Sequence, residues 1–317
     1  MENKIRLGIS SCLLGNKVRY DGGHKLNRYL HDTLAPYVEY VPVCAEAEIG
    51  LPVPRPTLRL VDTDDAAIGM VFSKTGEDIT ESMRSWSQRR VKELVAENLD
   101  GFVFKANSPS CGMERVKVYA KKGMPHKDGV GLFAAAFMQH FPLLPVEEEG
   151  RLNDAALREN FITRIFTLQR FRRSLGDNPS YGAVVKFHTQ HKLLIFSHSE
   201  KIYREMGRLV AHGKALPFEE FLAEYRTLLL KALQLKTTLN KHTNVLQHIM
   251  GYFKHDLSSD EKQEALDLIH SYKQGLVPLI VPITLLNHFV RKFKQEYLHE
   301  QVYLKPHPKE LKLLNHV

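Results

Sequence analysis

Apolar residues in the first half of the chain form short continuous runs that alternate with longer segments of helical spacing. The longer segments predict helices near residues 79–98 and 131–140. Strands separated by helices pair in parallel through right-handed crossovers, so we expect an α/β domain with a mainly parallel sheet. The short runs predict strands near residues 5–11, 38–43, 67–73, 101–105 and 143–146.

The pattern changes after the acidic loop at residues 147–150, beyond which the apolar spacing is helical throughout. We therefore expect an α/β domain in residues 1–150 and an all-α domain in residues 151–317. A chain of 317 residues with 43% hydrophobic and 25% charged residues is typical of two globular domains. The predicted helices lie near residues 153–174, 181–197, 200–212, 218–235, 240–254, 259–272 and 279–297.

The sequence predicts a cytoplasmic location. The apolar stretch at residues 275–290 is interrupted by Pro278 and Pro282, so it is not expected to span a membrane. No apolar secretory segment with a cleavage site is present at the N-terminus. Three cysteines are too few for a disulfide framework, which favours a reducing compartment.

Positive charge is concentrated in the second half. Residues 1–150 contain 19 Lys and Arg against 20 Asp and Glu, whereas residues 151–317 contain 25 against 16. A basic domain is a candidate for binding a phosphate backbone, with an affinity that falls as salt rises; an inert basic surface is the alternative. The amphipathic helix at residues 153–174 supplies the candidate RNA contacts, Arg164, Arg170, Arg172 and Arg173.

The three cysteines each follow a predicted strand. Cys12, Cys44 and Cys111 can meet because the carboxyl ends of parallel strands converge on one sheet edge. Thiolates are soft ligands that select zinc, copper(I) or iron–sulfur clusters. The separations of 32 and 67 residues disfavour a small zinc module, which uses paired local spacings. Three unrelated buried cysteines are the alternative.

The segments around the cysteines also suit a ligand site. Residues 13–23 form a loop rich in glycine, which lets backbone N–H groups approach a ligand. Prolines flank Arg55 and fix its reach, and the Ser-Pro-Ser-Cys-Gly turn places hydroxyls beside Cys111. Residues 129–134 match a weak GxGxxA pattern that opens a helix, and we expect this helix N-terminus to favour an anion.

Histidines form no comparable pattern. Twelve of the sixteen lie in the second half, and the tightest set is His188, His191 and His198. No carboxylate or thiol stands near them at ligand spacing, so we interpret them as polar-face or partly buried residues rather than metal ligands.

Three motifs resemble the signature of the thiouracil desulfurase family: SSCLLGxxVRYDGG, CxExxIGLxVPRP and KxxSPSCG. The resemblance covers roughly residues 5 to 147. It implies a Rossmann-like parallel sheet and a [4Fe–4S] cluster on Cys12, Cys44 and Cys111, with one iron left open for the sulfur of a thiolated pyrimidine. The family commonly has proline between the second cysteine and the glutamate, where this chain has Ala45.

The same resemblance implies roles for individual side chains. Glu46 would be the catalytic acid and base, and Ser108 would supply a hydroxyl that contacts the substrate. A surface glutamate and an ordinary turn serine are the alternatives for these two. We take the further substrate-binding candidates from the three motif segments: Ser11, Arg19, Arg55 and Ser110.

The second half resembles a helical domain often fused behind the desulfurase domain, through residues 187–192, 244–253 and 277–282. This architecture is similar to that of bacterial desulfidases that remove sulfur from 4-thiouridine in tRNA. The implied reaction is attack of water, activated by Glu46, on C4, with the nucleotide taken out of its stack and sulfide released.

Three other functions fit the same sequence. The substrate could be free thiouracil, or thiouridine nucleosides and nucleotides, rather than tRNA. The chain could be a redox or sulfur-transfer iron–sulfur protein. It could also be a non-enzymatic RNA-binding protein whose cysteines are structural.

Overall fold

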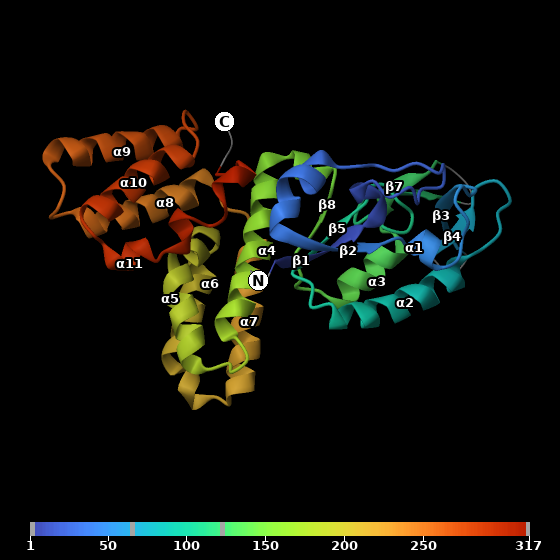
Figure 1. The fold of residues 1–317 in the computed structure, drawn as a ribbon, viewed down its shortest axis with the longest axis horizontal. Coiled ribbons are helices and arrows are strands. Elements are labelled where there is room, and N and C mark those ends of the chain that lie inside the picture. Colours follow the sequence, from blue (N-terminus) through green and yellow to red (C-terminus); the bar gives the residue numbers. More distant parts are fainter. Residues whose placement is uncertain (1–3, 64–66, 121–123, 315–317) are drawn as a thin grey trace. The chain divides into compact units, whose positions relative to one another are not determined.

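The computed structural model describes residues 4–63, 67–120 and 124–314 (Figure 1). The chain divides into two compact units, Met1–Asp154 and Ala155–Val317. The first is α/β and the second is helical, which confirms the predicted fold classes.

A parallel sheet forms the centre of the first unit, with the strand order β2-β1-β5-β8. Every neighbouring pair in this sheet is parallel, and Leu7 of β1 lies opposite Tyr40 on one side and Gly101 on the other. The last strand begins at Val146 rather than at the predicted Leu143, directly after Pro145, which has no N–H to donate to a ladder. The strands are β1 (Ile5–Ser10), β2 (Val38–Val43), β5 (Gly101–Phe104) and β8 (Val146–Glu148).

A second, mixed sheet corrects one sequence expectation. The strand predicted at residues 67–73 is not part of the parallel sheet, because it pairs antiparallel with the strand before it. Only five residues connect these two strands, and a parallel pair needs a crossover of a dozen or more. The order in this sheet is β4-β3-β6-β7, with β3 and β6 parallel. The strands are β3 (Leu58–Asp62), β4 (Ile68–Phe72), β6 (Val116–Tyr119) and β7 (His126–Gly129).

Two long helices, α2 (Thr80–Ala96) and α3 (Leu132–His140), lie side by side in the first unit (Figure 1). An aromatic cluster joins α3 to β5, and Phe102 stands at its centre, with ring centroids 4.4 Å from Phe104 and 4.7 Å from Phe137. A Cβ at Gly8 would lie 2.2 Å from Phe102, so β1 needs glycine where this ring packs. Shorter elements are α1 (Ala45–Glu48) and the single turns Ser11–Leu14, Tyr29–Leu34, Ala35–Tyr37 and Arg151–Asn153.

The helical unit contains two hydrophobic clusters, and α5 contributes to both. Phe187 packs in the first cluster with residues of α4, α6 and α7, while Leu193 and Leu194 pack in the second with α8, α9 and α10. This double burial explains why the buried residues of α5 are spread around the helix rather than along one stripe. The helices are α4 (Ala155–Leu175), α5 (Tyr181–His198), α6 (Glu200–His212), α7 (Phe218–Gln234), α8 (Leu239–Met250), α9 (Ser259–Lys273), α10 (Ile280–Lys292) and α11 (Glu296–His299), with short turns at Gly213–Ala215, Gly251–Phe253, Val302–Leu304 and Lys309–Leu311.

Four histidines are buried inside this unit: His188, His191, His198 and His242. Burial disfavours the charged imidazolium and lowers the pKa to about 4 for His188 and His198 and to about 3 for His191 and His242. These side chains are therefore neutral at pH 7. In the described part of the chain, no helix is long and apolar enough to cross a membrane.

Candidate active site

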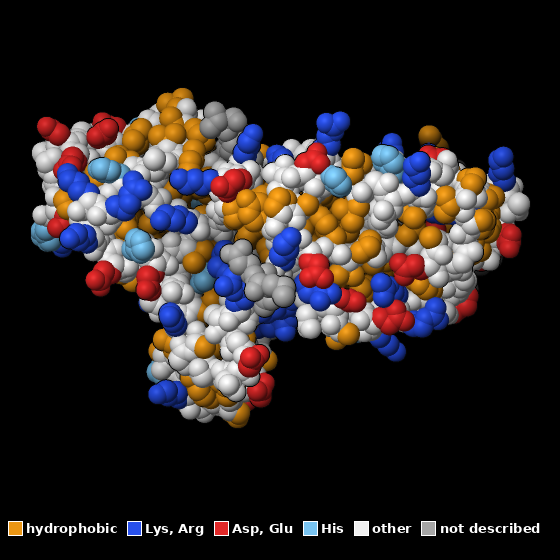
Figure 2. Space-filling model, viewed as in Figure 1, with side chains coloured by type: hydrophobic (Ala, Val, Ile, Leu, Met, Phe, Trp, Pro, Cys, Tyr) orange, Lys and Arg blue, Asp and Glu red, His pale blue; other side chains and the backbone are white. Residues whose placement is uncertain are grey.

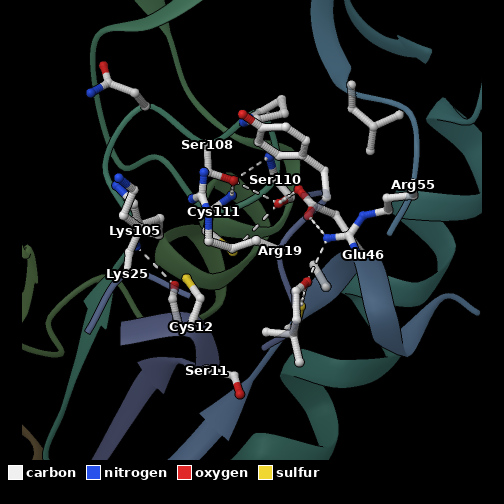
Figure 3. Close-up of a pocket in the computed structure, with 18 of the residues that line it drawn as sticks. Ser11, Cys12, Arg19, Lys25, Glu46, Arg55, Lys105, Ser108, Ser110 and Cys111 are labelled. Atoms are coloured by element: carbon white, nitrogen blue, oxygen red, sulfur yellow. Dashed lines mark hydrogen bonds and ion pairs between the residues drawn. The ribbon is translucent and has the colours of Figure 1, made fainter. Parts of the chain in front are cut away.

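The three cysteines line one cavity of about 350 Å³ in the first unit (Figure 3). Cys12 follows β1, Cys44 follows β2, and Cys111 lies in the loop after β5. Since β1, β2 and β5 are parallel neighbours, their carboxyl ends bring these loops together at one edge of the sheet.

All three thiols are free; those of Cys12 and Cys111 are buried, and that of Cys44 is partly buried. Burial raises the pKa of Cys12 to about 11, against a smaller opposing effect of the Lys105 ammonium. Burial also raises the pKa of Cys44, and that of Cys111 to about 12. The Cys44 thiol adds a smaller upward contribution to the pKa of both other thiols.

This donor set suits an iron–sulfur cluster better than a single ion. Among residues 4–63, 67–120 and 124–314, no group of three or more His, Cys, Asp or Glu side chains is arranged to hold one metal ion. A cluster has a different requirement, because each thiolate binds its own iron and the sulfurs stand farther apart. Three free thiols that line one cavity without converging on a single point meet that requirement.

Glu46 reaches the same cavity from α1, whose first turn follows Cys44. The backbone N–H of Cys44 donates to Glu48 Oε1 at 2.9 Å, so the helix begins at the cysteine itself. Ala45 is buried and occupies the first helical position, where proline and alanine are both tolerated. The absence of the family's proline therefore leaves the path from Cys44 to Glu46 intact.

Two side chains hold the Glu46 carboxylate. The guanidinium of Arg55 forms an ion pair with Oε2, and the hydroxyl of Ser110 donates to Oε1 at 2.8 Å (Figure 3). Arg55 also donates to the carbonyl of Val18 at 3.0 Å, and its side chain is only 1% exposed. Arg55, a substrate-binding candidate in the sequence, is thus a direct partner of Glu46.

The Ser-Pro-Ser-Cys turn forms a chain of hydroxyl contacts. Ser108 Oγ accepts from the backbone N–H of Cys111 at 3.1 Å and lies 3.0 Å from Ser110 Oγ. Ser110 in turn contacts both Glu46 and the sulfur of Cys111, the latter at 3.6 Å. Ser110, rather than Ser108, is therefore the serine next to the carboxylate, and Ser108 shapes the turn behind it.

Helix α3 docks on this turn, which corrects the anion expectation for its N-terminus. The backbone N–H groups of Phe133 and Ala134 donate to the Ser110 carbonyl at 3.0 and 3.1 Å, and that of Leu132 donates to Pro109. The first-turn donors are thus occupied by the chain. A Cβ at Gly131 would lie 2.6 Å from the Ser110 carbonyl carbon, so this close approach requires glycine.

The remaining predicted residues lie at the rim. Arg19 stacks over the Tyr20 ring, 5.2 Å from its centroid, and lies 3.5 Å from Asp21. Ser11 lines the cavity, but its hydroxyl accepts a hydrogen bond from Asn16 at 2.8 Å.

Sequence reasoning missed the Lys105–Glu149 ion pair beside Cys12. Lys105 could have been found from its place directly after β5, at the start of the third motif. Glu149 could not, because it belongs to the acidic loop that ends the unit.

The arginines proposed for RNA lie on α4 of the helical unit, and they differ in environment. The Arg170 guanidinium donates to the Pro306 carbonyl at 2.7 Å, to His191 at 3.3 Å and to Thr167 at 3.2 Å, so its donors are engaged within the helical unit. Arg173 is exposed, whereas Arg164 and Arg172 are half-buried. On the face shown in Figure 2, Lys and Arg side chains spread over the helical unit.

Residues 7–149, which contain the cysteine cavity, match the family model described as 2-thiouracil desulfurase. The N-terminal domain belongs to the 2-thiouracil desulfurase family. Residues 192–308 match a second model, DUF1722, described as a protein of unknown function. The chain therefore joins a desulfurase domain to a helical domain, as the motifs predict.

Three individual proteins are similar to parts of this chain. YbgA of Escherichia coli K12, described as uncharacterized, is 30% identical over 156 residues, which are 49% of this chain and 92% of YbgA. YbbK of Bacillus subtilis 168, also described as uncharacterized, is 29% identical over 33% of this chain and 71% of its own length. Among solved structures, the [4Fe–4S]-dependent thiouracil desulfidase TudS is 28% identical, with a TM-score of 0.40, over 49% of this chain and 97% of TudS.

Proposed function

We propose that the protein is a [4Fe–4S]-dependent desulfidase that converts 4-thiouridine in tRNA to uridine. The observation that carries the proposal is the cavity in which three free cysteines and Glu46 lie together, in a domain that matches the 2-thiouracil desulfurase model. The desulfurase chemistry follows from the family, and the name of TudS agrees with the cluster. The tRNA substrate follows from the basic helical unit.

Cys12, Cys44 and Cys111 would hold the cluster. When bound, a cluster on three thiolates supplies an open iron, a Lewis acid suited to a thiocarbonyl sulfur. Burial of Cys12 and Cys111 limits the access of bulk water to these two thiols.

Glu46 carries the proton transfer. Its carboxylate accepts the proton of a water molecule as the water attacks C4, and later returns a proton as the carbon–sulfur bond breaks. The sulfur leaves as sulfide and the carbon ends as a carbonyl, so no net electron transfer is required. Arg55 and Ser110 fix both carboxylate oxygens, which limits the rotation of Glu46 and orients it.

The helical unit would hold the RNA around the reacting base. Its excess of nine positive charges suits a phosphate backbone, and a thiolated base in folded tRNA must leave its stack to be reached. Exposed Arg173 remains the clearest candidate contact on α4, whereas Arg170 is committed to contacts within the unit.

The decisive experiment uses anaerobically purified, cluster-reconstituted protein and tRNA that contains 4-thiouridine. Nucleoside analysis of the digested RNA should show loss of 4-thiouridine with an equal gain of uridine. Variants with alanine at Cys12, Cys44 or Cys111 should each lose both the cluster absorbance and the conversion. No conversion by protein shown to carry its cluster would overturn the tRNA substrate.

Free thiopyrimidines are the second candidate, because the family description and the TudS name both refer to thiouracil. The same protein should then be incubated with 4-thiouracil and with 4-thiouridine 5′-monophosphate. Turnover of these compounds without conversion of tRNA would assign the small-molecule reaction.

A further inference from the structure

The helical unit contains a cavity of its own, of about 400 Å³. All of its lining residues belong to α4, α5, α8, α9 and the loops between residues 236 and 314, so none comes from the desulfurase domain. The desulfidation chemistry uses none of them.

Two neutral imidazoles line this cavity. His198 is only 2% exposed, and its Nδ1 lies 2.7 Å from the Leu235 carbonyl, which can only accept. Nδ1 therefore carries the proton, and Nε2 is left as an acceptor. His242 is 8% exposed, and its Nδ1 lies 2.9 Å from the Tyr303 hydroxyl.

The cavity offers further acceptors between aromatic rings. Asn160 donates its amide N–H to the Leu233 carbonyl at 3.2 Å, which leaves its amide oxygen as an acceptor. The rings of Tyr272 and Tyr303 lie with their centroids 6.2 and 5.8 Å from that of His242. A ligand that brings N–H groups on a flat ring would donate to these acceptors.

One part of the cavity wall offers hydrogen-bond donors and positive charge instead of acceptors. Lys236, Thr237 and Thr238 lead into the N-terminus of α8, and Lys236 is exposed. Thr238 Oγ1 accepts from the Lys241 N–H, whereas the N–H groups of Leu239 and Asn240 have no acceptor among the described residues. A helix N-terminus with free N–H groups beside a lysine favours an anion such as phosphate.

We infer that this cavity binds one nucleotide, with the base between His198, His242 and the tyrosines and the phosphate at Lys236 and the start of α8. The inference rests on the proposed function, to which it adds a nucleotide-holding site within the helical unit. A buried acceptor set and a phosphate site in the same cavity match the two ends of a nucleoside monophosphate.

The test is hydrogen exchange on the full-length protein, titrated with uridine 5′-monophosphate and followed by mass spectrometry. Peptides that cover residues 194–199 and 236–242 should exchange more slowly as the nucleotide is added. This readout lies in the helical unit, so nucleotide binding in the cysteine cavity does not produce it. Unchanged exchange in these peptides at millimolar nucleotide would overturn the inference.

Matched variants separate the two ends of the ligand. His198→Leu should weaken the protection about tenfold, the effect of one lost buried hydrogen bond. His188→Leu is the control, since His188 is equally buried in α5 but does not line the cavity. Lys236→Ala changes an exposed residue and should weaken uridine 5′-monophosphate but not uridine. Equal protection in wild-type protein, His198→Leu and Lys236→Ala would contradict the site.

A short oligouridine distinguishes the source of the nucleotide. Protection by both ligands assigns the cavity to a nucleotide within RNA, and protection by the monophosphate alone assigns it to the free nucleotide. The outcomes are separable from those of the proposed function. Conversion of thiolated tRNA without this protection would remove only the cavity, whereas protection without conversion would remove only the desulfidase.

Discussion

At the scale of single residues, the Glu46 carboxylate is the group to which we assign the proton transfer. We expect Glu46→Gln to keep the cluster and lower turnover by about 10²–10⁴-fold, because the amide cannot accept the proton of water. Cluster absorbance and turnover are measured on the same sample. Glu48→Gln is the control, since Glu48 lies in the same short helix and an amide oxygen can still accept from Cys44. Undiminished turnover in Glu46→Gln would remove Glu46 from the mechanism.

The two serines of the third motif should separate into a rate effect and a stability effect. Ser110→Ala removes a hydrogen bond to Glu46, and we expect turnover to fall about tenfold with little change in melting temperature. Ser108→Ala removes the acceptor of the Cys111 N–H, and we expect a stability loss of about 1 kcal/mol. Thermal unfolding and turnover of both variants decide this, and the reverse assignment would contradict the hydroxyl chain described above.

The sequence was informative about residue types but not about residue contacts. Cys12, Cys44 and Cys111 could be grouped because each follows a strand of one parallel sheet. The ion pair between Arg55 and Glu46 could not be predicted, because it depends on the three-dimensional path of the proline-rich segment that carries Arg55. Arg170 shows the same difficulty: its helical spacing indicates a polar face, whereas its guanidinium donates to Pro306, a residue 136 positions away.

At the scale of elements, α3 supports the cysteine site through its contact with the Cys111 turn. Gly131→Ala should displace that turn, because its Cβ would lie 2.6 Å from backbone atoms that cannot rotate away. We expect lower cluster occupancy and lower turnover. Gly150→Ala is the control in the same unit, where the new methyl would meet only the Ala106 side chain at 3.7 Å. Full cluster occupancy in Gly131→Ala would show that the turn does not depend on this contact.

Helices were predicted more accurately than strands, for a physical reason. A helix satisfies its backbone locally, so spacing in the sequence is enough to indicate α4 to α9 within a few residues. A strand depends on a partner strand for its hydrogen bonds. The apolar composition of residues 68–72 does not indicate which of the two sheets this strand joins. Its antiparallel pairing with β3 follows from a connection too short for a crossover, which the apolar pattern alone did not reveal.

At the scale of the whole molecule, the buried histidines make stability depend on pH. Their pKa values in the folded state, about 3 to 4, lie below the unfolded value near 6.5. Below pH 6.5 the unfolded chain therefore binds more protons, and stability falls as the pH falls toward 4. The slope approaches about 1.4 kcal/mol per pH unit for each histidine.

Denaturant unfolding followed by far-ultraviolet circular dichroism at pH 7.5, 6 and 5 measures this dependence. His188→Leu should have a shallower dependence on pH than the wild type, because it removes one titrating group. Equal slopes for the two proteins would show that His188 is not neutral and buried in the folded state.

The uneven charge of the two units should appear as a salt dependence of RNA binding. Each phosphate contact releases counterions, so the logarithm of the tRNA binding constant should fall linearly with the logarithm of salt concentration. Exposed Arg173 makes no ion pair within the described residues, and Arg173→Ala should reduce the magnitude of the slope by about 0.7–0.9, the value of one phosphate contact. Arg204→Ala is the control, because Arg204 is exposed on α6 but already paired with Glu200 at 2.6 Å. Filter binding between about 50 and 300 mM salt measures the tRNA binding constant of the wild type and both variants.

An unchanged slope in Arg173→Ala would place the RNA-binding surface away from this end of α4. A wild-type slope near zero would remove the electrostatic argument for RNA binding altogether.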